Sequence, residues 1–141
     1  MRVDFYFNVD HRLQYACRVV RKARAANLSV LVYARDADRM ARFDNALWTF
    51  SALDFVPHVY VDSPLAHGTP VWLTLTADGD TRRDLLLNLD DDVPAAGWCT
   101  GFPRVIEVVS RDDDDRARAR QRFRTWRERG VVPAAHEVSG E

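Results

Sequence analysis

Residues 3–34 read VDFYFNVDHRLQYACRVVRKARAANLSVLVYA, and a change of hydrophobic period within this stretch decides the fold class. It begins with the two-residue alternation of a strand, with Val3, Phe5 and Phe7 on one side and Tyr6 on the other. A helical spacing follows from His11 to Asn27, with apolar residues at Leu13, Ala16, Cys17, Val20 and Ala23 and with cations opposite them at Arg12, Arg18, Arg21, Lys22 and Arg24. The stretch ends in the continuous apolar run of a strand that is buried on both faces. A strand, a helix and a second strand within about 30 residues predict a right-handed parallel unit.

Downstream of this unit, the sequence continues to alternate between strands and helices. Strands are predicted over residues 71–76, 84–89 and 105–109, and helices over residues 36–48 and 112–129. Asp36 is a candidate N-cap, and the carboxylates in the first turn of the last helix oppose its dipole favourably. Residues 95–103 are expected to form either a short helical turn or a loop. We therefore predict a single α/β domain over residues 1–130, with a mostly parallel sheet centred on the first strand, followed by a mobile tail over residues 131–141.

Length and composition limit the class of protein. A chain of 141 residues with 47% apolar content and a formal net charge of -1 is large enough for one hydrophobic core. The two cysteines make no disulfide framework, and Cys17, on the apolar face of its helix, is expected to be a small buried hydrophobe in a reducing cytosol. No window has the ~20 apolar residues that a membrane span needs. We expect a soluble cytoplasmic protein.

Sequence motifs for a cofactor or a metal are absent. The first strand-to-helix turn has no glycine, and neither the dinucleotide-binding fingerprint nor a glycine-rich phosphate loop occurs. None of the four histidines has metal-ligand spacing with another histidine or a cysteine. The aspartate runs at 90–92 and 112–115 could hold a divalent cation, but such runs are more often a solvated strand end and a helix start. We expect neither cofactor nor metal, and a small α/β enzyme that uses His58 or Cys99 stays open as the alternative.

Residues 44–58, DNALWTFSALDFVPH, carry six large apolar side chains within ten positions and then reach a proline. Pro57 lacks a backbone donor and disfavours helical geometry at Val56. The segment after Trp48 is therefore expected to be a loop or an extended piece that carries aromatic side chains near the surface. Exposed aromatics of this kind usually meet a partner, although the same residues could belong to the core.

The last predicted helix carries a stripe of arginines. At about 100° per residue, one stripe holds Arg116, Arg120, Arg124 and Arg127, and the stripe beside it holds Ala119, Phe123 and Trp126. This arrangement suits an acidic peptide that ends in an aromatic residue and a free carboxylate, because the arginines would take the charge and the apolar stripe the ring. A solvated helix face is the simpler interpretation. A nucleic-acid backbone is the weaker alternative, because the chain lacks a basic net charge and a broad basic patch.

Ordered motifs in this sequence resemble the chi subunit of bacterial DNA polymerase III. They are DNALW at residues 44–48, FVPH at 55–58, RRDLLLNL at 82–89, and VIEVV at 105–109 leading into the arginine-rich helix that ends at Gly130. The resemblance covers residues 3–130 and rests on the order of the set, since none of the motifs is distinctive alone.

The resemblance implies a noncatalytic replication adaptor with a Rossmann-like fold and helices on both faces of its sheet. Chi proteins pair with the psi subunit of the clamp loader and bind the acidic C-terminal tail of single-stranded DNA-binding protein, so contact with DNA would be weak or indirect. Carried over by position, the psi-facing surface would hold Trp48, Phe55, Val56 and Pro57, and the tail site Arg116, Arg120, Phe123 and Arg124. Two features depart from the family: phenylalanine stands at 123, where tyrosine is common, and the acidic run at 112–115 would repel an acidic tail that lay beside it.

Overall fold

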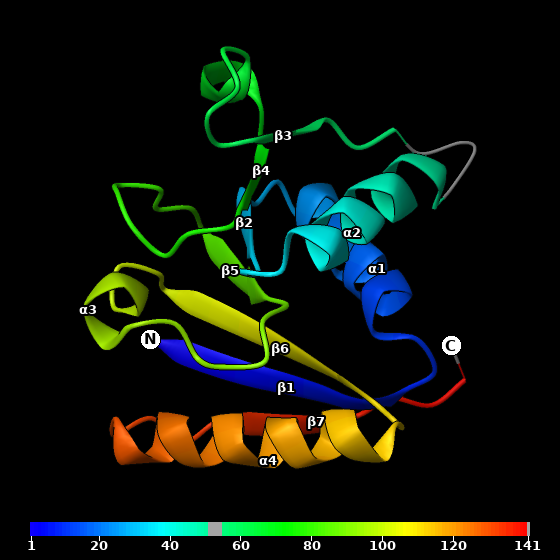
Figure 1. Cartoon of the computed structure of the whole chain (residues 1–141), viewed down its shortest axis with the longest axis vertical. Coiled ribbons are helices and arrows are strands. Elements are labelled where there is room, and N and C mark those ends of the chain that lie inside the picture. Colours follow the sequence, from blue (N-terminus) through cyan, green and yellow to red (C-terminus); the bar gives the residue numbers. More distant parts are fainter. Residues whose placement is uncertain (51–54, 141) are drawn as a thin grey trace.

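The computed structural model describes residues 1–50 and 55–140, and these form a seven-stranded sheet with parallel neighbours throughout (Figure 1). The strand order is β3-β4-β2-β5-β6-β1-β7. The strands are β1 (Arg2–Val9), β2 (Val30–Tyr33), β3 (His58–Tyr60), β4 (Val71–Thr74), β5 (Leu85–Asn88), β6 (Arg104–Ser110) and β7 (Ala134–Glu137). The helices are α1 (Arg12–Ala25), α2 (Ala37–Thr49), α3 (Ala96–Cys99) and α4 (Asp113–Glu128), with a 3-10 turn, η1, at Ala66–Gly68. The predicted α/β class is confirmed.

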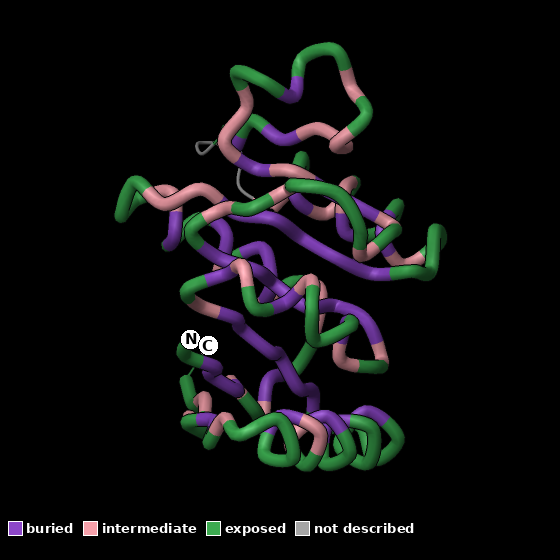
Figure 2. Tube along the Cα trace, turned by 90° about the vertical axis from the view of Figure 1, so that its left-hand side faces the viewer, coloured by how far each residue is buried: buried purple, intermediate pink, exposed green. Residues whose placement is uncertain are grey.

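Helices cover both faces of this sheet. On one face α1 and α2 pack through residues such as Val20 and Phe43, and on the other α3 and α4 contribute Cys99 and Trp126 to a second apolar cluster. Strands β2 and β5 are buried along their whole length, and Figure 2 shows buried residues concentrated in the layer between the helices. Within the described ranges, no helix is both long and apolar enough to cross a membrane.

Local sequence signals predicted the long helices to within two residues at either end. Asp36 caps α2, because its carboxylate accepts hydrogen bonds from the backbone N–H groups of Asp38 and Arg39. Asp112 caps α4 in the same way through the N–H of Asp115. Residues 95–103, for which the sequence predicted either a short helical turn or a loop, contain the short helix α3.

The predicted tail is wrong for residues 134–137, which form β7 and pair in parallel with residues 4–7 of β1. His136 anchors this strand: its Nε2 lies 2.9 Å from Oδ1 of the buried Asp4, and its ring stacks on Tyr6 with centroids 4.8 Å apart. The prediction that the first strand is central is also wrong, because β1 lies next to the edge strand β7 and β5 is in the middle. The sequence of β7 is AAHE, with no apolar alternation to reveal it. Glu141 lies outside the described residues.

Arg12 is not on the solvated face of α1 where the helical spacing puts it. Its side chain is only 10% exposed. Its Nε donates to the carbonyl oxygen of Val108 at 2.9 Å and its Nη2 to that of Asp90 at 3.0 Å. Burial lowers the pKa of Arg12 to about 10. The arginine therefore ties the start of α1 to the carboxyl ends of β5 and β6.

Candidate functional site

The first candidate surface, called the aromatic patch below, consists of Trp48 in α2 and of Phe55 and Pro57 just before β3. Trp48 is 50% exposed and Phe55 is 71% exposed, and their ring centroids lie 5.1 Å apart. Pro57 is exposed as well. Two large aromatic side chains in contact on the surface are a typical protein-binding feature.

Val56 does not belong to the aromatic patch, although the carry-over from the family included it. It is 8% exposed and lies in the core cluster with Leu47. In an extended segment, neighbouring side chains point to opposite sides, so Phe55 and Pro57 face outward when Val56 faces the core. The loop expected after Trp48 includes residues 51–54, which are outside the described residues.

His58 packs beneath the aromatic patch, against the ring of Trp48. It is 4% exposed, and its ring centroid lies 4.3 Å from that of Trp48. Its Nε2 is 2.8 Å from Oδ1 of Asp44 in α2, and its Nδ1 is 2.7 Å from the carbonyl oxygen of Val56. These contacts hold the end of α2 against the start of β3. Sequence reasoning considered His58 as a catalytic residue, as a possible metal ligand and as part of the FVPH motif, and no sequence signal links it to Asp44.

The second candidate surface, called the arginine stripe below, consists of Arg116, Arg120 and Arg124 on α4 together with Phe123 beside them. All three arginines are exposed, and none forms an ion pair with a residue that the structure describes. By contrast, Arg118 on the same helix lies 3.8 Å from the carboxylate of Asp91. The arginines of the stripe are therefore available for an external anion.

Phe123 gives the arginine stripe an apolar side. It is half-buried, and its ring centroid lies 5.3 Å from that of Phe5 on β1. Phe7, two residues further along β1, points to the same face of the sheet and is 37% exposed. Phe7 was not among the predicted site residues. The apolar alternation of β1 was its only signal, and alternation does not distinguish a buried position from an exposed one.

A buried ion pair fixes the face that α4 turns to the sheet. Glu107 on β6 and Arg122 on α4 have side chains that are 0% and 1% exposed, and Oε1 of Glu107 accepts from Nε of Arg122 at 2.9 Å. Oε2 of Glu107 accepts from the indole N–H of Trp126 at 3.0 Å. Because Arg122 and Trp126 are held against the sheet, the helical period turns Arg120 and Arg124 outward.

The acidic first turn of α4 lies at one end of the arginine stripe. Asp112 and Asp115 serve the fold, since Asp112 caps the helix and Oδ2 of Asp115 accepts from the backbone N–H of Ser110 at 2.7 Å. Asp113 and Asp114 are exposed. Their negative charge is nearest to Arg116 and weakens with distance along the helix. An acidic ligand is therefore favoured toward Arg120 and the residues beyond it.

The alternative of an enzyme that uses His58 or Cys99 receives no support from the geometry. Cys99 is 1% exposed and belongs to the apolar cluster beneath α3 and α4, whereas His58 lies in the edge strand β3 and is bonded to α2. Burial raises the pKa of the Cys99 thiol to about 11, so it is not a thiolate at neutral pH. Among residues 1–50 and 55–140, no group of three or more His, Cys, Asp or Glu side chains could hold a metal ion.

The aromatic patch and the arginine stripe are far apart in the sheet order. The patch joins α2 to β3, which is one edge strand, whereas α4 packs on β6, which is two strands from the other edge. Figure 1 shows α2 and β3 at the opposite end of the molecule from α4. One chain thus carries an exposed apolar surface and an exposed cationic surface at different places.

Comparisons with known proteins give a consistent family. Residues 1–134 match the family model described as DNA polymerase III chi subunit, HolC. The protein named DNA polymerase III subunit chi from Pseudomonas aeruginosa is 35% identical over 141 residues, covering 97% of this chain and 96% of the relative. Proteins of the same name from Escherichia coli and Haemophilus influenzae are 29% and 26% identical over 118 residues, covering 83% of this chain and 79% and 81% of those relatives.

Proposed function

Because this chain belongs to the DNA polymerase III chi subunit family, and so is an accessory subunit for DNA replication, we propose that it is a noncatalytic adaptor. It connects a psi-like subunit of the clamp loader, through the aromatic patch, to the acidic C-terminal tail of single-stranded DNA-binding protein, through the arginine stripe. The observation that carries this proposal is the presence of two unlike exposed surfaces, one aromatic and one cationic, toward opposite ends of the sheet. Contact with DNA is expected to be weak or indirect.

The arginine stripe is suited to the tail because its charges are exposed beside an aromatic ring and have no ion pair with a described residue. The terminal carboxylate and the acidic residues of the tail would lie on the arginines, and its apolar end would lie against Phe123. Arg120 is expected to contribute more than Arg116, because Arg116 is nearer to the exposed Asp113 and Asp114.

We predict that Arg120→Ala weakens binding of the tail peptide by about 1.5 to 3 kcal/mol, the range for a hydrogen bond to a charged group. The measurement is fluorescence anisotropy with a labelled peptide of the tail sequence. Arg42→Ala is the matched control, since Arg42 is also exposed but lies on α2. Unchanged affinity of Arg120→Ala would remove the arginine stripe from the proposal.

The aromatic patch is suited to the psi-like partner because its two large rings are exposed while the residues beneath them, Val56 and His58, are fixed in the core. Hot-spot contacts in protein interfaces are often aromatic side chains of this kind.

We predict that Trp48→Ala abolishes copurification with the psi-like subunit and leaves the far-ultraviolet circular dichroism spectrum unchanged, because the indole is half exposed. Leu65→Ala is the control, since Leu65 is an apolar residue with 70% exposure outside the patch. A stable heterodimer with Trp48→Ala would show that the partner binds elsewhere.

A further inference from the structure

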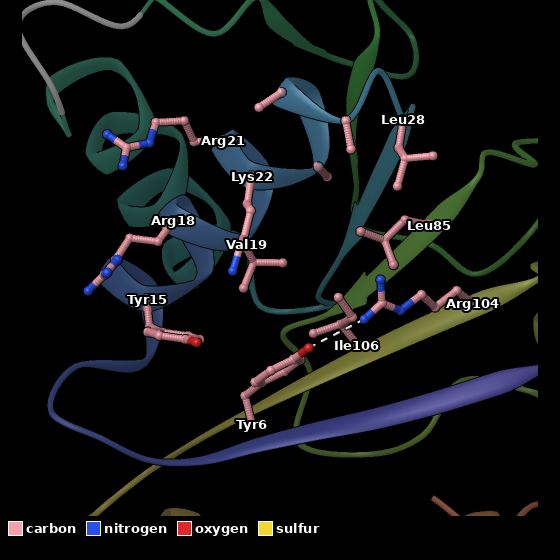
Figure 3. Close-up of a pocket in the computed structure, with 13 residues that line it drawn as sticks. Tyr6, Tyr15, Arg18, Val19, Arg21, Lys22, Leu28, Leu85, Arg104 and Ile106 are labelled. Atoms are coloured by element: carbon pink, nitrogen blue, oxygen red, sulfur yellow. Dashed lines mark hydrogen bonds between the residues drawn. The ribbon is translucent and has the colours of Figure 1, made fainter. Parts of the chain in front are cut away.

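A cavity of about 570 Å³ lies on the α1 face of the sheet, apart from both docking surfaces (Figure 3). It is bounded by α1 and by β1, β5 and β6. Its floor is apolar, with contributions from Val19, Leu28, Leu85 and Ile106. A cavity of this volume is in the range that binds small organic ligands.

The charges around this cavity have one sign. Four cations line it, Arg18, Arg21, Lys22 and Arg104, and no carboxylate does so among the described residues. The whole chain, in contrast, has a net charge of -1. Figure 3 shows Lys22 on one wall of the cavity and Arg104 on the other, whereas the side chains of Arg18 and Arg21 extend away from it. These two arginines act on a ligand in the cavity only through their electrostatic potential. The charged side chains of the lining therefore favour an anionic ligand over a cationic one.

Arg104 is held in position by groups behind it. Its Nε donates to Oδ2 of Asp4 at 3.0 Å, and Asp4 has no exposed surface. Its Nη2 donates to the hydroxyl of Tyr6 at 3.3 Å. Its Nη1 has no hydrogen bond to a described residue, and the ammonium of Lys22 has no ion pair with one. The opposed walls thus offer unused donors to one anionic group.

Two tyrosines complete the cavity with polar and aromatic surface. The rings of Tyr6 and Tyr15 lie 6.2 Å apart, and Figure 3 shows both hydroxyls directed toward the cavity. His136 stacks on Tyr6 and fixes its ring. A planar ligand group in the cavity would contact the apolar floor with one face and the hydroxyl groups of Tyr6 and Tyr15 with its edge.

We propose that this cavity binds a nucleoside monophosphate, with the phosphate between Lys22 and Arg104 and the base over the apolar floor beside Tyr6 and Tyr15. A dianionic phosphate is favoured over a monoanionic carboxylate because two cationic side chains, Lys22 and Arg104, face the cavity from opposite walls. The same chemistry is present in a free nucleotide and in the 5′-phosphorylated end of a single strand. The proposal does not depend on either docking surface.

The test is calorimetric titration of the full chain with dTMP, thymidine and inorganic phosphate at millimolar concentrations. We expect dTMP to bind, and thymidine and phosphate to bind at least about tenfold more weakly, because each lacks half of the contacts. Lys22→Gln should weaken dTMP binding about tenfold or more, since it removes one charged donor. Arg42→Gln, a charge change at an exposed position of α2 that does not line the cavity, should leave it unchanged. Lys22 is exposed, so its replacement does not endanger the fold.

A second variant and a second ligand sharpen the result. Val19→Phe would fill the cavity without removing a charge, and it should also abolish dTMP binding. If a 5′-phosphorylated thymidine oligonucleotide binds more tightly than dTMP and loses affinity in Lys22→Gln, the ligand is the phosphorylated end of a strand. If dTMP binds more tightly than the oligonucleotide, the ligand is the free nucleotide. No binding of dTMP at millimolar concentration, or equal binding by the wild-type chain and Lys22→Gln, overturns the proposal.

Discussion

Asp4 has no exposed surface, and its carboxylate depends on three hydrogen-bonding partners. Arg104 and His136 lie 3.0 and 2.9 Å from its oxygens, and Arg2 donates from the strand terminus. Burial by itself raises the pKa of Asp4, but the hydrogen bonds from His136, Arg104 and Arg2 outweigh it and hold the pKa below its ordinary value. Asp4 therefore stays ionised at neutral pH and joins β1, β6 and β7.

We predict that Asp4→Asn lowers the free energy of unfolding at pH 7 by about 2 kcal/mol, the scale of hydrogen bonds to a charged group. Because the folded pKa of Asp4 is depressed, its contribution is present above the unfolded pKa of about 4 and is lost as the pH falls through the folded pKa. The difference between the two proteins should thus shrink in acid.

Urea unfolding at pH 7 and at acidic pH measures this effect. Asp62→Asn is the control, since Asp62 is exposed. A difference that stays constant as the pH falls would show that the charge of Asp4 is not what stabilises the sheet.

Residue patterns identified exposed aromatics better than they identified buried polar groups. The proline at 57 indicated an irregular aromatic segment, and the structure exposes Trp48 and Phe55. The carry-over from the family placed Val56 on the surface although it is buried, and helical spacing placed Arg12 in solvent although it is enclosed. An arginine becomes a core residue only when distant carbonyls or carboxylates meet it, and these contacts are not visible in local spacing.

Helix α4 combines a buried charge on one side with free charges on the other. Arg122 is enclosed against Glu107, while Arg120 and Arg124 are exposed. Helical spacing puts Arg122 on the same side of α4 as Ala119 and Trp126, but an arginine is seldom buried unless it has a partner, and its residue type therefore did not indicate burial. Its partner, Glu107, lies on a strand that precedes the helix, so the pair depends on how the two elements pack.

We predict that Arg122→Gln lowers the free energy of unfolding by about 3 to 5 kcal/mol, because it leaves Glu107 as an uncompensated buried charge. Arg124→Gln, two residues away on the exposed face, should change it by less than about 0.5 kcal/mol. Urea denaturation of both variants, followed by circular dichroism, gives the comparison. Equal stability of the two variants would mean that the buried pair does not fix α4.

At the level of elements, helices were predicted better than the sheet edge. Caps and apolar periods are local, so α2 and α4 were found with their starting residues. Strand β7 is different, since it has no alternation and is held by backbone pairing with β1 and by His136. A strand of this kind is recognised only after its partner is known.

The order of strands determines where the aromatic patch and the arginine stripe lie on the whole molecule. The sequence alternates strands and helices, which predicted a parallel α/β sheet, but strand order depends on pairings between distant segments. With β3 at one edge and β1 and β7 at the other, the aromatic patch and the arginine stripe point to different ends. The two proposed partners would therefore bind surfaces that do not overlap.

We therefore predict that the two proposed contacts are independent. The tail peptide should bind the chain alone and the chain in complex with its psi-like partner with dissociation constants within about twofold, as expected for sites that share no side chains. Trp48→Ala should leave tail binding unchanged, and Arg120→Ala should leave copurification with the psi-like subunit unchanged. Anisotropy titrations of the tail against the isolated chain, the heterodimer and both variants measure the coupling. A tenfold change in tail affinity upon heterodimer formation would mean that the sheet transmits a conformational change between its ends, or that the partner itself extends to α4.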